Sequence, residues 1–95
     1  MDSQVTKQKM VEEVARRLAM SESDVSLVYN ELLEVIKESL KRRKTVVFRG
    51  FGKLYPLKLK KRSMRSPQTG KMLHLPARYT VRFKPSPFLK QDVNS

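Results

Sequence analysis

The 95-residue sequence contains no cysteine and only one histidine. Without cysteine, the chain can form neither a disulfide framework nor a cysteine-based zinc site or nucleophile, which agrees with a reducing compartment. His74 lies between Leu73 and Leu75, with no second histidine or carboxylate close to it in the sequence. A bound metal is therefore not expected, and no other cofactor is expected.

Long apolar runs and catalytic motifs are also missing. No run of 18 or more apolar residues and no charged, apolar leader occurs, so neither a membrane span nor a secretion signal is predicted. We therefore expect a cytoplasmic protein with no membrane partner. The sequence has no Gly-rich phosphate loop, no nucleophile beside a base and no clustered carboxylates, so it predicts neither an enzyme nor a small-molecule substrate. Its length suits one domain, residues 1–95.

Acidic residues are nearly absent from the second part of the chain. Residues 1–40 hold five Lys or Arg against eight Asp or Glu, whereas residues 41–95 hold sixteen against one. The net charge is −3 in the first part and +15 in the second. Positive charges concentrated in this way repel one another unless a polyanion neutralises them. Nucleic acid is the commonest polyanion inside a cell. The basic part is therefore predicted to bind nucleic acid.

Apolar periodicity predicts two helices in the acidic part. Thr6 can cap a first helix over about 7–19, and Ser21 with Asp24 has the spacing of a capping box that would start a second. The second helix carries more apolar residues than one short partner helix needs, and we interpret the excess as a subunit interface. Its predicted interface residues are Val28, Leu32, Leu33 and Ile36.

After the basic run KRRK at 41–44, the pattern changes from helical to extended. Strands are predicted over 45–48 and 53–61, joined by a tight turn in which Phe51 is an anchoring aromatic between Gly50 and Gly52, two small residues that tolerate unusual backbone angles. Pro56 cannot donate to a ladder, so the second strand should be an edge strand or be bulged there.

A third strand is predicted over about 72–84, with alternating apolar and cationic residues. Pro85 and Pro87 end it, and Pro87 suits the first turn of a short final helix over about 86–94. The predicted fold is α+β: two N-terminal helices, a three-stranded antiparallel sheet with a long protruding β-hairpin arm, and a C-terminal helix.

The stretch RSPQTGK at 65–71 reads as the tip of that hairpin. An isolated two-stranded ribbon is marginal in water, so a basic ribbon should become ordered on a ligand. Pro67 has two interpretations at this point. It can be a turn former acting with Gly70, or its rigid ring can enter between base pairs in a minor groove.

RSPQTGK, together with GFGKL at 50–54, FKPSPFLKQDVN at 83–94 and the two preceding helices, resembles the HU and integration host factor family over residues 6–94. The resemblance implies an intertwined homodimer with a helical base (about 6–42), a saddle sheet with its arm (about 45–84) and the C-terminal helix. It also implies a nucleoid-associated architectural protein. Such a protein binds double-stranded DNA through the minor groove with low sequence specificity, and bends it by proline intercalation.

The resemblance also assigns residues. Pro67 would be the intercalating residue, with Arg65 in the minor groove beside it. Cations of the arm, the saddle and the flanks would contact the DNA backbone: Lys58, Lys60, Lys61, Arg62, Lys71, Arg78, Arg82, Lys84, Lys7 and Lys90. A solvated surface charge is an equal alternative for each of the flank residues Lys7 and Lys90. Apolar residues under the saddle would complete the dimer core: Phe48, Phe51, Leu54 and Phe83.

Some positions depart from the family pattern. Ser66 stands where asparagine is usual, Met64 where glycine is common, and Pro87 where a flanking lysine often stands. Leu57 and Leu59 stand where many relatives carry arginine. For these two leucines, either a bulge near Pro56 shifts the strand phase or the base of the arm presents apolar side chains to a partner.

Three other functions remain open. A subunit like those of integration host factor would prefer particular sequences through DNA deformability. An RNA-binding protein is compatible with the charge, although the sequence shows no aromatic pair on an exposed sheet face for base stacking. A purely structural oligomer would not bind DNA at about 50 mM salt, where non-specific electrostatic binding is strong.

Overall fold

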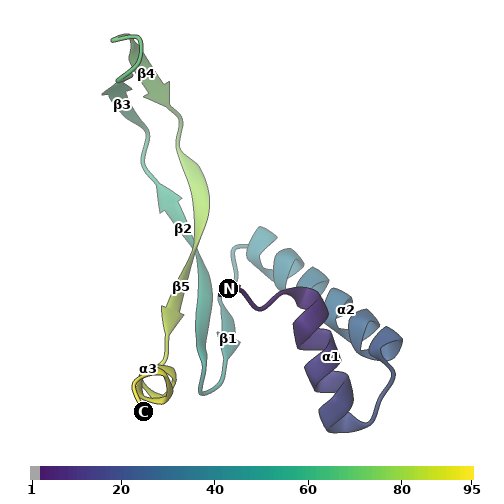
Figure 1. Cartoon of the computed structure of the whole chain (residues 1–95). Helices are drawn as coiled ribbons and strands as arrows, with labels where there is room; N and C mark the ends of the chain where they lie inside the picture. The colour runs from purple at the N-terminus through teal and green to yellow at the C-terminus, as the bar shows by residue number, and fades with distance from the viewer. Residues whose placement is uncertain (1–2) are drawn as a thin grey trace. The chain divides into compact units, whose positions relative to one another are not determined.

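The computed structural model describes residues 3–95, and the α+β fold is confirmed (Figure 1). The helices and strands of this part follow in chain order: α1 (Lys7–Leu18), α2 (Glu22–Lys41), β1 (Val46–Phe48), β2 (Gly52–Leu59), β3 (Arg62–Arg65), β4 (Met72–Leu75), β5 (Arg78–Pro85) and α3 (Pro87–Val93). They form two compact units, which meet in the sequence between Glu38 and Ser39.

Both predicted N-terminal helix starts are confirmed by side-chain caps. Thr6 Oγ1 accepts a hydrogen bond from the Lys9 backbone N–H at 3.4 Å, and Ser21 Oγ accepts one from the Asp24 N–H at 3.0 Å. Each bond satisfies a donor that the first turn of a helix leaves unpaired. The first helix ends at Ala19, which adopts the left-handed conformation with φ of 52°.

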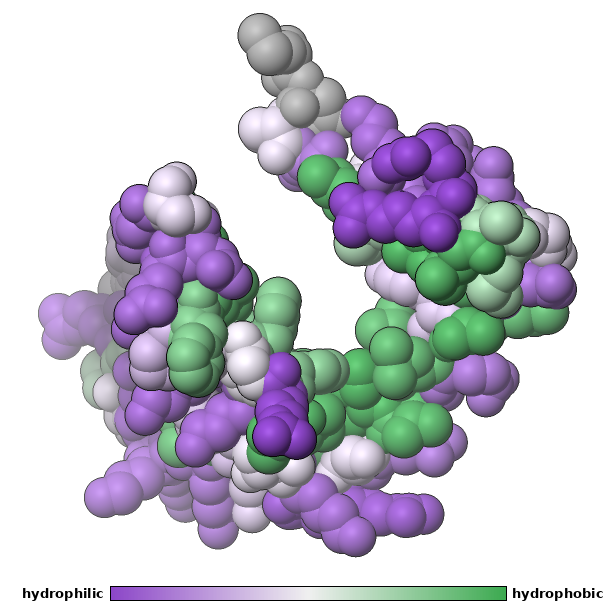
Figure 2. All heavy atoms as spheres, turned by 90° about the horizontal axis from the view of Figure 1, so that it is seen from below, coloured by the Kyte–Doolittle hydropathy of each residue, from purple (hydrophilic) through white to green (hydrophobic). Residues whose placement is uncertain are grey.

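The helical unit has a small core of its own. Val11 and Ala15 of α1 and Val25 of α2 are its buried apolar residues. Further along α2, Val28 and Leu32 remain 63% and 55% exposed, and they line an apolar hollow on that helix. Exposed apolar surface is visible in green in Figure 2. Within residues 3–95, no helix is both long enough and apolar enough to cross a bilayer.

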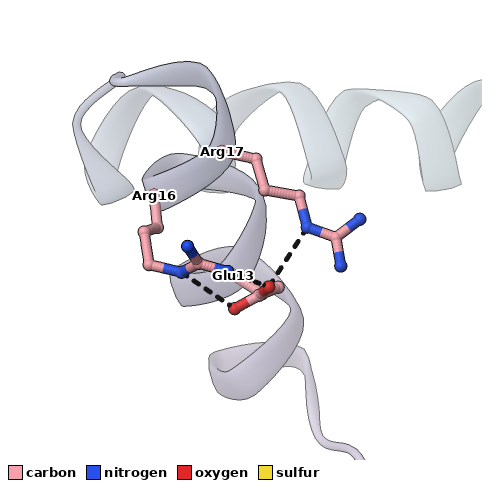
Figure 3. A network of polar contacts seen from close by, with 3 residues as sticks. All are labelled: Glu13, Arg16 and Arg17. Carbon is pink, nitrogen blue, oxygen red and sulfur yellow. Dashed lines mark hydrogen bonds and ion pairs between the residues drawn. The ribbon is translucent and has the colours of Figure 1, made fainter.

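Acidic side chains neutralise cations on the helices. Glu13 of α1 forms ion pairs with Arg16 and Arg17 (Figure 3), and Lys37 pairs with Glu34 on α2. Hydrogen bonds from Arg16 and then from Arg17 hold the pKa of Glu13 below its usual value. These are the ion pairs found within residues 3–95, so the cations of the sheet unit meet no acidic partner there.

The sheet unit contains a three-stranded antiparallel sheet in the order β1-β2-β5 and a separate ribbon of β3 and β4. The register of β2 and β5 runs without interruption from Gly52 opposite Pro85 to Leu59 opposite Arg78. Pro56 therefore lies in an unbulged stretch, which excludes the bulge, one of the two predicted alternatives. The other alternative, an edge, holds at Pro56, because β1 pairs only with residues 52–54 of β2.

The hairpin arm is divided where the sequence predicted continuous strands. The strand predicted over 72–84 is two strands, β4 and β5, and its partner breaks between β2 and β3. Pro76 lies in the gap and has no N–H to donate to a ladder, which accounts for the break. The paired segments are separated by two residues on each strand, 60–61 and 76–77. Because the two gaps are equal in length, the register of β2 with β5 continues unchanged in that of β3 with β4.

The two glycines of the β1–β2 turn have different roles. Gly50 has φ of +77°, and the Phe51 N–H closes the turn on the Phe48 carbonyl at 2.9 Å. The predicted tight turn is confirmed, and of its two glycines Gly50 uses the left-handed region while Gly52 does not. Gly52 instead makes room for the ring of Phe83, which leaves no space for a Cβ atom.

The C-terminal helix is fixed to this turn by Ser86. Its hydroxyl donates to the Gly50 carbonyl at 3.0 Å and accepts from the Leu89 N–H at 3.1 Å. Its backbone N–H donates to the Phe51 carbonyl at 2.8 Å. Pro87 occupies the first helical turn as predicted, because an N–H there would lack an intrahelical acceptor.

Candidate nucleic-acid interface

The tip of the arm is a closed four-residue loop, residues 67–70. The Ser66 N–H donates to the Lys71 carbonyl at 2.8 Å, and the Gly70 N–H donates to the Ser66 carbonyl at 2.9 Å. Gly70 has φ of +73°, a conformation that glycine adopts without steric cost. Because these closing bonds use the backbone of Ser66, the tip does not depend on an asparagine side chain. Pro67 is exposed at the start of the loop, and Arg65 is exposed at the end of β3.

The three-stranded sheet presents two chemically different faces. Side chains alternate along a strand, so cross-strand pairs share a face. On the face defined here as the basic face, Tyr55 lies opposite Arg82 and Leu59 opposite Arg78. The other face is mainly apolar. Since the register is continuous, Leu57 and Leu59 lie on the basic face, so no phase shift accounts for the missing arginines.

Four predicted DNA-binding residues gather at the base of the arm. One hollow of about 410 Å³ is lined by Leu59 and the cationic residues Lys60, Arg62, Arg78 and Arg82. These side chains come from both strands and from the break between β2 and β3. Four cations around one opening with no acidic partner form a site for a polyanion.

The other predicted arm residues are exposed but lie apart from this hollow. Lys58 is opposite Tyr79, on the mainly apolar face. Lys61 lies in the break, and Lys71 closes the tip through its backbone. All twelve predicted DNA-binding residues are exposed, including the two flank lysines.

The flank residues differ in their contacts. In the helical unit, Lys7 Nζ donates to Asn30 Oδ1 at 2.8 Å and lies 5.6 Å from the centre of the Tyr29 ring. Lys7 is thus exposed to solvent and also contacts side chains of α2. In the sheet unit, Lys90 is exposed on α3.

Lys53 is a cation of the basic face that was not among the predicted DNA-binding residues. It lies directly opposite Lys84, and both line a second hollow of about 330 Å³ together with Thr45, Tyr55 and Pro56. Two like charges in opposite positions destabilise a sheet. The alternation along 53–61 could have identified Lys53, but only once its strand partner was known.

The mainly apolar face carries the predicted dimer-core aromatics. The Phe51 ring centre lies 6.3 Å from that of Phe48 and 5.8 Å from that of Phe83. Phe51 and Phe83 are nevertheless 51% and 44% exposed, while Phe48 and Leu54 are half-buried. This cluster is therefore incompletely covered by its own chain.

On the arm, His74 of β4 has a local partner. Its Nδ1 lies 2.9 Å from the hydroxyl of Ser63, the residue directly opposite on β3. Within residues 3–95, no group of three or more His, Cys, Asp or Glu could hold a metal ion. Met64 lies opposite Leu73 on the same ribbon, and both side chains are exposed.

Comparison with known proteins agrees with this geometry. Residues 5–94 match the family model described as bacterial DNA-binding protein. The chain is 35% identical over 92 residues to integration host factor subunit beta of Hahella chejuensis, covering 96% of this chain and 94% of that protein. It is 34% identical over 89 residues to the DNA-binding protein HU of Thermotoga maritima, covering 94% and 99% respectively.

Solved structures show the same fold. A cocrystal structure of Anabaena HU with DNA matches with a TM-score of 0.87 at 25% identity, covering 94% of this chain and 97% of that one. The structure of a mutant HU from Thermotoga maritima matches with a TM-score of 0.71 at 25% identity, covering 94% and 99%. The chain therefore belongs to the bacterial DNA-binding protein family of HU and integration host factor, a family of architectural proteins.

Proposed function

We propose that two copies of this chain form an intertwined homodimer that binds double-stranded DNA through the minor groove and bends it with little sequence preference. The observation that carries this proposal is the arm. Its exposed tip presents Pro67, and its base holds Lys60, Arg62, Arg78 and Arg82 around one hollow. A cationic ribbon that ends in an exposed, rigid apolar ring suits a bent duplex.

Pro67 is the residue that would intercalate between base pairs. Its ring is apolar and carries no N–H that would need a partner between stacked bases. Partial unstacking of a base step by such a ring kinks the duplex toward the major groove. Arg65, two residues before it, would lie in the minor groove, where the negative potential is strong.

The cations of the arm and the basic face supply the affinity. Each phosphate that they neutralise releases condensed counterions, so binding should weaken steeply with salt. These contacts carry no direct sequence information, which favours low specificity. A nucleoid-associated role in the cytoplasm, with one DNA-binding domain per chain, is the corresponding cellular function.

The homodimer is supported by the apolar surfaces that a single chain leaves open. Val28 and Leu32 remain exposed on α2, and Phe51 and Phe83 on the sheet. A soluble monomer rarely exposes apolar patches of this kind unless they mark an interface. We infer that the partner covers them, with Leu33, Ile36, Phe48 and Leu54 completing the predicted dimer core.

A sequence-preferring role is the second candidate function. It is favoured by the 35% identity to integration host factor subunit beta, which is close to the 34% identity to HU. Such a protein would discriminate through DNA shape. Competition between random DNA and candidate sites separates the two roles: equal competition supports the HU-like role, and a preference of a hundredfold or more would overturn it.

A salt titration with two 35-base-pair duplexes tests the proposed function. One duplex is intact and the other is nicked, and fluorescence transfer between the ends reports the bend. We expect a steep salt dependence, with tighter binding and stronger bending on the nicked duplex, because a nick lowers the cost of a kink. Equal affinity for both duplexes without bending would leave a generic polycation and contradict the proposal. Preference for double-stranded RNA of the same sequence would instead favour RNA binding.

A further inference from the structure

We propose that the turn after α2, residues 41–44, is a further phosphate-binding surface, which extends the DNA interface beyond the arm and the basic face of the sheet. This inference rests on the proposed function, because it takes the ligand to be duplex DNA. The turn has the sequence KRRK, and all four side chains are exposed.

The turn is held in one backbone conformation. The Arg43 N–H donates to the Leu40 carbonyl and the Lys44 N–H to the Ser39 carbonyl, both at 3.0 Å, which is the paired closure of a Schellman motif. Arg43 itself has φ of 62°, in the left-handed region where this motif usually places glycine. Glycine would adopt this left-handed conformation with less strain than arginine. We therefore infer that the side chain of Arg43 has a role beyond solubility.

A stacking contact explains how an arginine is accommodated there. The guanidinium carbon of Arg43 lies 3.8 Å from the centre of the Tyr79 ring of β5. Its Nη1 also donates to the Lys41 carbonyl at 3.1 Å. Planar guanidinium groups stack favourably on aromatic rings. Arg43 thus fixes the turn against the strand that carries Arg78 and Arg82.

The turn is continuous with the basic face of the sheet at one place. Thr45 follows the turn directly and lines the hollow that contains Lys53 and Lys84. Tyr79, under Arg43, lies on the mainly apolar face opposite Lys58, so its contact with Arg43 holds the turn in place and does not itself extend the basic face. The proposed phosphate contacts of Arg42 and Lys44 would therefore adjoin the interface through Thr45.

The charge of the turn is not neutralised by the surrounding chain. Asp92 is the only acidic residue of the sequence between 41 and 95. The ion pairs found among residues 3–95 involve residues of α1 and α2 before position 38. Because hydrogen bonds already fix the backbone of the turn, only the side chains of Arg42 and Lys44 would lose conformational freedom on binding, which favours phosphate contacts.

The test compares the full-length protein with Arg42→Gln/Lys44→Gln, which removes two charges and leaves Arg43 in place. Binding to an intact 35-base-pair duplex is measured between about 50 and 300 mM KCl. Each lost phosphate contact lowers the salt slope by about 0.9, so a dimer that loses four contacts should lose roughly 3 to 4 from its slope. Lys9→Gln/Lys37→Gln is the matched control, since it removes the same charge from the helical unit and should change the slope far less.

Tyr79→Leu provides a second readout, because it keeps every cation but removes the ring under Arg43. We expect binding to weaken about two- to fivefold, with the salt slope retained. If Arg42→Gln/Lys44→Gln has the same salt slope as the wild type, and the wild type itself shows a steep slope and bends DNA, this inference is overturned and the proposed function stays intact. A shallow slope in the wild type would instead refute the proposed function itself.

Discussion

Gly52 lies against the ring of Phe83 so closely that a Cβ atom at position 52 would come within 2.6 Å of Phe83 Cζ. The same atom would also lie 2.7 Å from the Lys84 carbonyl oxygen. Backbone atoms cannot move aside without disturbing the pairing of β2 and β5.

Gly52→Ala is therefore expected to destabilise the fold by about 1 to 3 kcal/mol, the usual cost of overpacking. Thermal unfolding at one fixed protein concentration measures the loss. Gly50→Ala is the matched control: its Cβ meets no atom within 4 Å, so only the strain of φ +77° remains, about 1 to 2 kcal/mol. An unchanged unfolding temperature for Gly52→Ala would contradict the packing role.

Lys53→Gln should make the free protein more stable and its DNA complex weaker. Removal of the like-charge pair with Lys84 should stabilise the sheet by about 0.2 to 1 kcal/mol. The variant also loses one phosphate contact per chain, so the salt slope of a dimer should fall by about 2. Melting curves at low salt and binding titrations measure the two effects. Weaker binding without the gain in stability would show that the pair does not repel in the free protein.

Pro67→Ala is expected to reduce DNA bending more than DNA affinity. Alanine lacks the rigid ring that would enter the base stack, whereas the cations at the base of the arm are unchanged. End-to-end fluorescence transfer reports the bend, and titration at constant salt reports the affinity. Pro87→Ala, in the first turn of α3 and outside the arm, is the control for loss of a proline. A bend angle equal to that of the wild type would return Pro67 to the role of a turn residue.

Leu32→Asp is expected to dissociate the dimer and, as a result, to abolish DNA binding. Leu32 is 55% exposed in the single chain and lines the apolar hollow of α2, so a buried carboxylate would replace a buried leucine in the dimer. Light scattering coupled to gel filtration measures the mass. Val5→Asp, at a 69% exposed position before α1, should leave the mass unchanged. A Leu32→Asp protein with the wild-type mass would contradict the predicted interface.

Glu13→Gln should reduce stability near pH 7 and have no effect near pH 2. Hydrogen bonds from Arg16 and Arg17 lower the pKa of Glu13 in the folded state. A lowered folded pKa stabilises the protein above the unfolded pKa, and this contribution is lost as the pH falls through the folded pKa. Melting curves at both pH values measure it. A difference that persists at about pH 2 would point to a cause other than the charge.

Local signals allowed much of the fold to be predicted. Thr6 and Ser21 each mark a helix start through a side chain that accepts a hydrogen bond from a backbone N–H three residues later, and Pro87 marks one because it has no N–H to leave unpaired in the first turn. The strand and turn pattern also predicted the arm, and the family resemblance then supplied the saddle and the candidate DNA-binding residues. Those residue assignments remain predictions.

The features that could not be predicted depend on distant parts of the chain. The need for Gly52 comes from the ring of Phe83, and the opposition of Lys53 to Lys84 comes from the register of β2 and β5. The stack of Arg43 on Tyr79 joins residues 36 positions apart. None of these contacts has a signature in the local sequence, because each requires the strand pairing to be known.

The break in the arm has a mechanical consequence. Residues 60–61 and 76–77 lie outside both ladders, yet they keep the register of the two paired segments equal. The ribbon of β3 and β4 is therefore joined to the three-stranded sheet through four residues outside both ladders, and a change of angle at this joint would need no slip in register. In the proposed DNA complex, such a joint would let one arm follow duplexes of different curvature.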